Sequence, residues 1–301
     1  MDWILLSIGS AFMFAIVITA DKLLLSTYLP NPRSLFFLFG IIQVVMATTI
    51  LLIEPWDSSP SGSTLTIGTV SGITFIAGLM CMFYGISRLE VSRVIAIYHT
   101  YPVFVGLLAV VFLGEHLSAV AWLAILVTIL GAAFVAIGQS HSEQNDGPLI
   151  IYGVVVIGSL LTAIANVTYK YALDGFAFWD INALRAFSGG LIFIIVGWNA
   201  RTISDLRSLS SSPIGVGIFV FAEILAAPVA MILMFSALNA GPASLVSTLI
   251  SIRPLFVLFI AGLLSTGHLN LLNEPITKNN MIGKLIPISM IVVGVTTLTM
   301  L

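Results

Sequence analysis

Ten apolar stretches, separated by short polar breaks, run through the 301-residue chain and restrict its fold class more than any other feature. They occupy residues 3–20, 34–53, 67–87, 94–113, 119–138, 149–169, 183–200, 214–238, 243–264 and 281–301. Each is close to the ~20 residues that an α-helix needs to cross the hydrocarbon core of a bilayer. Backbone polar groups in lipid need partners within the segment or around a closed barrel, and long apolar runs without strict alternation favour helices. The sequence therefore predicts an all-α integral membrane protein with ten transmembrane helices.

The composition also indicates a membrane protein. Hydrophobic residues make up 59% of the chain and charged residues 8%, and the mean hydropathy is +1.13. The polar breaks are too short to bury a core of their own, so no soluble domain is expected. The net charge of −2 argues against a nucleic-acid partner. We expect a multi-pass protein of the plasma or inner membrane, surrounded by lipid.

The two halves of the chain carry similar sequences. The run Pro102-Val-Phe-Val-Gly-Leu-Leu-Ala109 matches Pro254-Leu-Phe-Val-Leu-Phe-Ile-Ala261, and in the same register His116 meets His268. The polar break at 139–148 lies midway, with five apolar segments on each side. The pattern predicts an internal repeat of five helices.

An odd number of helices in each repeat has a topological consequence. Two five-helix units joined in series, residues 1–140 and 148–301, enter the membrane from opposite sides and form an inverted repeat. Inverted repeats recur in secondary transporters, whose substrate site lies near the middle of the membrane between the halves. Architecture alone does not establish function, so the side chains must be considered.

A short motif lies near the end of each half. Leu113-Gly114-Glu115 follows the proline-led fourth segment, and Gly131 lies in the next helix. The second half is similar but has Leu272-Asn273-Glu274, with asparagine in place of the glycine. These motifs resemble those of the EamA-type modules of the drug/metabolite transporter superfamily, and the resemblance covers essentially the whole chain as two modules. It implies a secondary transporter, commonly an exporter of metabolites or drugs, that works by alternating access.

Four charged residues lie inside the predicted segments, all of them in the second half: Arg185, Glu223, Arg253 and Lys284. A charge at the centre of a transmembrane helix costs roughly 2.5–3.5 kcal/mol on insertion scales, so each needs a partner, water or a function. Glu223 is the most central, and Pro228 is expected to loosen its helix. Two interpretations remain open: a carboxyl that carries a proton, or a structural ion pair with Arg253 or Arg185.

Arg253 precedes Pro254, midway along the ninth segment. A guanidinium suits a carboxylate or a phosphate, so Arg253 is a candidate contact for an anionic group of the substrate, with a structural salt bridge as the alternative. Ser251 belongs to a polar stripe on this helix, and in an ideal helix Arg253 points almost opposite to that stripe. The two residues line one site only if Pro254 distorts the helix.

The counterpart of this stretch in the first half is Tyr98-His99-Thr100-Tyr101-Pro102. His99 can titrate near neutrality, which makes it a candidate for proton coupling, and a hydrogen-bonded packing role is the alternative. Tyr98 and Tyr101 are expected to line a cavity with aromatic walls and hydroxyl groups.

Polar residues of the sixth and seventh segments complete the candidate site. Asn166 and Lys170 lie four residues apart on one helical face, and Arg185 lies on a similar face of the seventh segment. These faces are expected to point into the bundle, although snorkelling to the interface also explains Lys170 and Arg185. Glu115 is interpreted as a boundary residue that favours the N-terminus of the helix that follows it.

These features predict a secondary transporter of small metabolites or drug-like solutes. Export is the expected direction, protons are a candidate coupling ion, and the central cavity is expected among segments four, six, eight and nine. A membrane-embedded enzyme would need a reactive set such as Gly-x-Ser-x-Gly or His-Glu-x-x-His, and the sequence contains neither. A channel is the other alternative, but rings of charges or carbonyls are not evident. No cofactor, metal ion or catalytic residue is expected.

Overall fold

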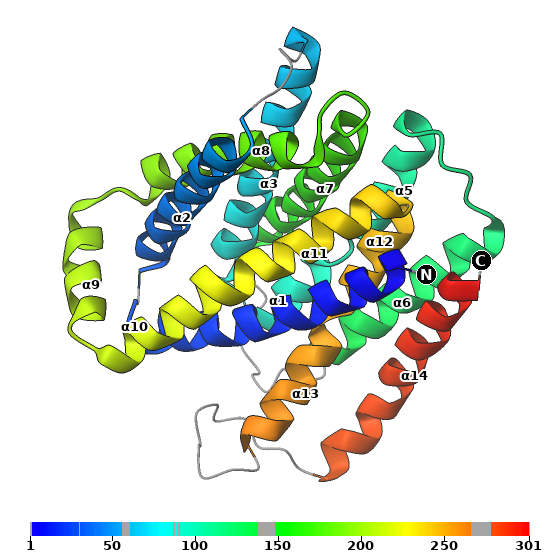
Figure 1. The fold of residues 1–301 in the computed structure, drawn as a ribbon. Helices are drawn as coiled ribbons and strands as arrows, with labels where there is room; N and C mark the ends of the chain where they lie inside the picture. The colour runs from blue at the N-terminus through cyan, green and yellow to red at the C-terminus, as the bar shows by residue number, and fades with distance from the viewer. Residues whose placement is uncertain are drawn as a thin grey trace.

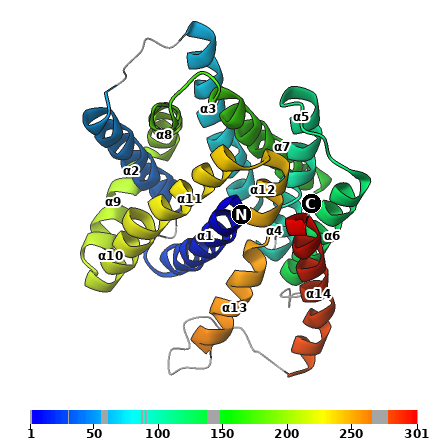
Figure 2. The same cartoon turned by 45° about the vertical axis from the view of Figure 1, so that its right-hand side comes forward.

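The computed structural model describes residues 2–29, 31–55, 61–86, 88–89, 91–137, 148–265 and 278–300, and every regular element in these ranges is helical (Figures 1 and 2). The helices are α1 (Asp2–Thr27), α2 (Pro32–Ile53), α3 (Gly62–Ile86), α4 (Val91–Tyr98), α5 (Tyr101–Phe112), α6 (Ala119–Ile137), α7 (Leu149–Ala172), α8 (Phe178–Gly197), α9 (Ala200–Ser210), α10 (Pro213–Phe219), α11 (Ala227–Ala240), α12 (Ala243–Ile250), α13 (Arg253–Ser265) and α14 (Lys278–Met300). A π-helical stretch, η1 (Val220–Ala226), joins α10 to α11.

Most predicted segments coincide with helices to within a few residues, but α1 is longer than predicted. It continues to Thr27 instead of ending at residue 20, and so contains Asp21 and Lys22. The prediction that all intramembrane charges lie in the second half is therefore wrong. The polar break before Pro213 also holds a helix, α9, which is too polar and too short to span a bilayer.

The fourth and ninth segments are each broken in the middle, shortly before a proline. α4 ends at Tyr98 and α12 at Ile250, and each lies four residues before its proline, Pro102 or Pro254. Proline has no N–H to donate to the carbonyl four residues earlier, and its ring crowds that carbonyl. In both breaks the residue after the proline donates its N–H to the carbonyl three residues back, at 3.0 Å in the first and 2.9 Å in the second. The two breaks therefore have the same cause and the same local geometry.

Helices of the first half pack mainly against helices of the second half. α2 packs on α8, α3 on α7, α6 on α14 and α1 on α11, and further contacts join α5 to α7 and α12 and α1 to α13. Glycines permit the close approaches: a Cβ on Gly40 of α2 would lie 2.7 Å from the carbonyl oxygen of Gly190 on α8. A Cβ on Gly78 of α3 would lie 2.9 Å from the carbonyl oxygen of Gly158 on α7. Small residues at such contacts are the usual means by which helices associate in lipid.

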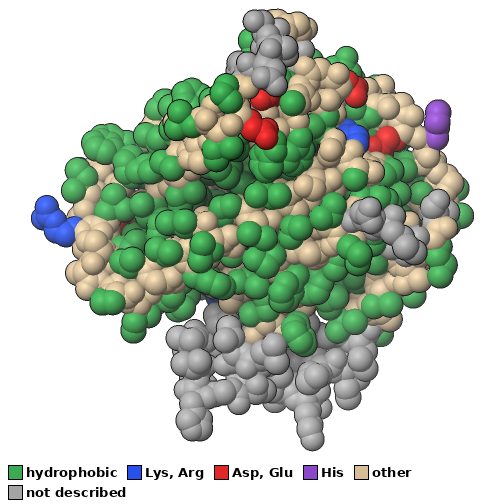
Figure 3. All heavy atoms as spheres, viewed as in Figure 1, with side chains coloured by type: hydrophobic (Ala, Val, Ile, Leu, Met, Phe, Trp, Pro, Cys, Tyr) green, Lys and Arg blue, Asp and Glu red, His purple; other side chains and the backbone are tan. Residues whose placement is uncertain are grey.

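The surface is that of an integral membrane protein. Figure 3 shows a face covered largely by hydrophobic side chains, and Val111, Ile150 and Ile195 are each more than 70% exposed. Six of the described helices are long and apolar enough to cross a bilayer, and four shorter apolar helices accompany them. These findings agree with an all-helical membrane fold, whereas the number of ten crossings stays a prediction.

Candidate functional site

Three rings at the first helix break form the centre of a buried polar region. The rings of Tyr98, His99 and Tyr101 lie 5.9, 6.0 and 6.4 Å apart, centre to centre, and all three side chains are buried. The Tyr98 hydroxyl shares a 2.6 Å hydrogen bond with Thr162 of α7, and the Tyr101 hydroxyl donates to the Ser247 carbonyl of α12 at 3.2 Å. The break therefore connects elements of both halves through hydroxyl groups.

Arg253 lies at the second break, close to these rings. Its guanidinium carbon is 3.9 Å from the ring centre of Phe14 on α1, and its charge acts on Tyr98, His99 and Tyr101. Because the helix is interrupted before Arg253, the angle of an ideal helix between Arg253 and Ser251 does not apply. The Ser251 hydroxyl nevertheless donates to a carbonyl of its own helix at 2.7 Å and supports the break.

Arg185 is held more firmly than Arg253. Its Nη1 donates to Ser71 Oγ of α3 at 2.9 Å and to the Ala165 carbonyl of α7 at 3.2 Å. Aromatic rings from three helices surround its guanidinium carbon at 4.6, 5.0 and 5.4 Å: Phe75, Phe235 and Tyr169. Arg185 is 4% exposed, so it does not snorkel to an interface but ties α3, α7 and α8 together.

Several buried polar atoms around these residues have no hydrogen-bond partner in the part of the chain that the structure describes. They include Oδ1 of Asn166, Oδ1 of Asn182, Nη2 of Arg185 and Nδ1 of His99. Unsatisfied polar atoms are costly in a protein interior and concentrate where a ligand or ordered water binds. The face of α7 that carries Asn166 is therefore directed into the bundle, as its spacing predicts.

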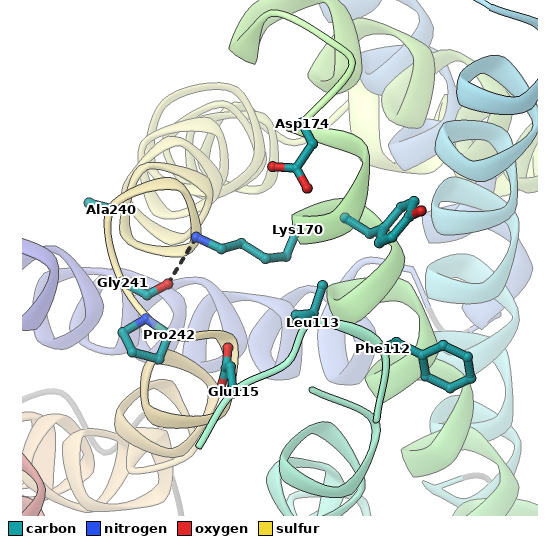
Figure 4. A pocket seen from close by; sticks show the side chains of 9 residues that line it. Phe112, Leu113, Glu115, Lys170, Asp174, Ala240, Gly241 and Pro242 are labelled. Carbon is teal, nitrogen blue, oxygen red and sulfur yellow. Dashed lines mark hydrogen bonds between the residues drawn. The ribbon is translucent and has the colours of Figure 1, made fainter. Parts of the chain in front are cut away.

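Lys170 lies at the far end of the same face, in a cavity of about 430 Å³ (Figure 4). Its Nζ donates to the carbonyls of Leu238, Asn239 and Gly241 at 2.6, 3.2 and 3.1 Å. These carbonyls are at the C-terminus of α11, where a cation is favourable. Lys170 therefore fixes the turn between α11 and α12.

Glu115 holds the other side of that turn. Its carboxylate accepts hydrogen bonds from the backbone N–H groups of Ala243 and Ser244 at 2.5 and 3.3 Å, and from the Ser244 hydroxyl. Ala243 and Ser244 form the N-terminus of α12 in the second half. Glu115 therefore caps α12 and not α6, the helix that follows it in the sequence. That part of the sequence interpretation is wrong, because the partner is 128 residues away in the chain.

The partner of Glu223 was not predicted. Its carboxyl lies against the carboxyl of Asp21 on α1, close enough for the two to share a hydrogen bond, and Glu223 is 5% exposed. Glu223 lies in η1, which ends two residues before Pro228, and the helix loosens there as the proline predicts. Oδ1 of Asp21 and Oε1 of Glu223 are both buried without a partner. Within the described ranges, neither Arg185 nor Arg253 forms an ion pair with Glu223.

Comparison with known proteins decides the family. The sequence profile of the EamA-like transporter family matches residues 1–137 and 149–300. The chain belongs to the EamA-like transporter family. Membership places this EamA-like protein among multi-pass membrane transporters and not among enzymes, as the sequence motifs predict.

Two curated relatives are similar over part of their length. They are the pseudopaline exporters CntI of Pseudomonas aeruginosa strains UCBPP-PA14 and PAO1, each 28% identical over 169 residues, which is 56% of this chain and 56% of each relative. This EamA-like chain thus matches little more than half of their length. A solved crystal structure covers 99% of this chain and 96% of its own with a TM-score of 0.72 and 12% identity, which shows a common fold.

The predicted site residues of this EamA-like transporter do not all lie together. Tyr98, Tyr101, His99 and Arg253 lie together at the two breaks. Arg185 and Asn166 lie beside them in the interior, whereas Lys170 and Glu223 lie apart from them and from each other. The side chain of Lys284, the fourth intramembrane charge, falls outside what the structure describes.

Proposed function

We propose that this chain exports a small organic solute by alternating access, with ten crossings arranged as two inverted five-helix halves. The helix pairing supports this, because it is unchanged when corresponding segments of the two halves are exchanged. The first segment packs on the eighth, as α1 on α11, and the sixth packs on the third, as α7 on α3. The second packs on the seventh, as α2 on α8, and the fifth on the tenth, as α6 on α14. Halves related by a two-fold axis in the membrane plane have this property.

The single observation that carries the proposal is the pair of matched helix breaks. They lie at Pro102 and Pro254, and α5 packs directly on α12. Secondary transporters hold substrates at discontinuous helices near the middle of the membrane, where unpaired backbone groups and polar side chains are available. In this chain Tyr98, Tyr101 and Arg253 would contact the solute, with His99 beside them.

Two polar contacts between the halves would act as gates. Glu115 binds the start of α12 at one end, where the N-terminal part of α1 also lies, because a Cβ on Gly241 would be 2.7 Å from the Trp3 ring. Asp21 binds Glu223 further along α1. At 1.5 Å per residue, Asp21 lies about 27 Å from Trp3 along the helix, which is close to the thickness of a hydrocarbon core. The two contacts are therefore placed to close opposite sides of one central cavity.

The Asp21–Glu223 pair would couple transport to protons. A hydrogen bond between two carboxyl groups requires that at least one of them carries a proton, and two ionised carboxylates at this distance would repel. Protonation would therefore hold α1 against η1, and loss of the proton would separate the halves at this end. The proton site expected at Glu223 alone is extended to Asp21 in this proposal.

The other predicted residues would support these parts. Arg185 and Asn166 would shape the wall of the cavity, Lys170 would keep the α11–α12 turn in position for Glu115, and Ser251 would stabilise the break. The direction of transport rests on similarity to proteins named as exporters.

The test is solute flux in proteoliposomes across a metabolite panel, with and without a pH gradient. We expect gradient-driven flux in the wild type that both Asp21→Asn and Glu223→Gln uncouple from the gradient. The exposed Glu54→Gln is the matched control and should remain coupled. Flux that stays gradient-dependent in both variants would reject the proton role, and absence of flux for every solute would reject the transport proposal.

A further inference from the structure

Arg253 carries a positive charge that no acidic side chain balances within the described part of the chain. Its guanidinium carbon lies 3.9 Å from the centre of the Phe14 ring, and its Nε is buried without a hydrogen-bond partner among the described residues. The residue as a whole is half-buried at the start of α13. A guanidinium that is only partly accessible and has no described carboxylate beside it would bind a negatively charged ligand group favourably.

Among the residues that the structure describes, two buried or partly buried carboxyl groups that link the halves are engaged elsewhere. Glu223 is hydrogen-bonded to Asp21, and Glu115 is bound to the N-terminus of α12, about three helical turns before Arg253. The groups near enough to Arg253 for its charge to act on them include the uncharged hydroxyls of Tyr98 and Tyr101 and the ring of His99. No described carboxyl group is therefore available to Arg253, and its position suits an anion supplied from outside the chain.

Arg185 provides an internal comparison. Two hydrogen bonds and three aromatic rings hold its guanidinium, which is fully enclosed. Arg253 contacts one ring, its buried Nε has no hydrogen-bond partner among the described residues, and part of its side chain is accessible. The chain therefore contains one arginine built into the scaffold and one left available for a ligand.

The surroundings of Arg253 define the class of that ligand. A planar carboxylate fits the two-donor edge of a guanidinium and carries one negative charge, which a single arginine balances, whereas a phosphate monoester carries nearly two at neutral pH. The rings of Phe14, Tyr98 and Tyr101 favour an apolar or aromatic body next to the charged group. We infer that Arg253 binds the carboxylate of an amphipathic organic acid and that such acids are the substrate class of this transporter. The inference rests on the proposed transport function.

The test compares acids with neutral molecules of the same shape. Purified protein in detergent is titrated with 3-phenylpropionate, hexanoate, their primary amides and phenyl phosphate, and binding is followed by the shift in melting temperature. The same solutes are then assayed for counterflow in proteoliposomes. Variants are Arg253→Gln, Arg253→Lys and, as a matched control on the exposed face of α9, Arg201→Gln.

We expect the wild type to prefer each acid over its amide. Arg253→Gln should weaken acid binding at least tenfold, or ~1.4 kcal/mol, and leave amide binding unchanged. Arg253→Lys keeps the charge without the planar fork and should retain part of the preference, while Arg201→Gln should match the wild type.

The possible failures are distinguishable. Equal binding of acids and amides, a preference that survives Arg253→Gln, no binding of either acid up to its solubility limit, or tighter binding of phenyl phosphate would overturn the inference. Counterflow of neutral solutes at a rate that Arg253→Gln does not change would overturn the substrate class but would still support the transport function. Acid binding that depends on Arg253 without any counterflow would support the anion site and contradict the proposed transport.

Discussion

Replacing Glu115 with glutamine is expected to open the end of the protein at which the first half meets α12. The Glu115 carboxylate accepts hydrogen bonds from the backbone of Ala243 and Ser244 at 2.5 and 3.3 Å, and from the Ser244 hydroxyl. These are the unpaired donors of a helix N-terminus, which also carries a partial positive charge. The amide of glutamine has one acceptor oxygen and no charge, and its NH₂ group faces donors.

The expected magnitude follows from these contacts. Loss of a side-chain cap costs about 0.5–2 kcal/mol, and loss of a favourable charge at a partly buried helix terminus costs up to ~2 kcal/mol. Since glutamine keeps only part of these hydrogen bonds, we expect the free energy that favours the closed state at this end to fall by about 2 kcal/mol. This corresponds to a factor of roughly 30 in the ratio of closed to open states at this end.

The assay is the labelling rate of a single cysteine by a membrane-impermeant maleimide. Val246→Cys, in a Cys81→Ala background, places the thiol at a fully buried position one turn into α12 from Ala243. Adding Glu115→Gln should raise the labelling rate by up to ~30-fold, whereas the exposed control Glu54→Gln should leave it unchanged. Unchanged or slower labelling in Glu115→Gln would refute the view that Glu115 closes this end.

Three further perturbations follow from the packing. Arg185→Lys retains the charge but loses the planar fork that binds α3 and α7, so the melting temperature in detergent should fall by the equivalent of about 2 kcal/mol; a fall no larger than that of Arg201→Lys would contradict the scaffold role. Gly40→Ala places a Cβ 2.7 Å from the Gly190 carbonyl oxygen and should destabilise the α2–α8 contact by about 1–3 kcal/mol. Gly217→Ala, where a Cβ meets no atom within 4 Å, should not lower the melting temperature, and equal effects of the two alanines would count against the close packing. Lys170→Met removes three hydrogen bonds to the end of α11, so backbone hydrogen exchange in residues 239–244 should become faster, and unchanged exchange there would contradict the assigned contact.

Hydropathy and proline positions predict much of this fold because both act locally. A run of about 20 apolar residues needs no tertiary information to be recognised as a helix in lipid. Pro102 and Pro254, which the repeat match aligns, likewise interrupt their own helices through a missing N–H, although the sequence analysis considered such a distortion only for Pro254. The interior placement of Asn166 and Arg185 follows in the same way from helical spacing.

Contacts between distant segments could not be predicted in this way. Asp21 ends the first apolar run in a hydropathy scan, so its helix was predicted to stop before it, and only tertiary packing shows that α1 continues and pairs Asp21 with Glu223. Glu115 was assigned to the nearest helix in sequence, because nothing in the chain indicates the approach of α12. Asp21 lies directly after the end of the first apolar run. A charged residue within one turn of such an end is the signal that would have suggested that the helix continues through it.

Alternating access is tested most directly by labelling both proposed gates in the same conditions. Val246→Cys reports on the Glu115 end, and Ala222→Cys, fully buried next to Glu223, reports on the carboxyl pair, each in the Cys81→Ala background. Labelling rates are measured with impermeant maleimide from either side of the membrane as the pH is varied. We predict opposite changes: acid pH should protect position 222 and expose position 246, and alkaline pH should reverse both. Rates that rise and fall together, or protection of both positions at every pH, would contradict the mechanism.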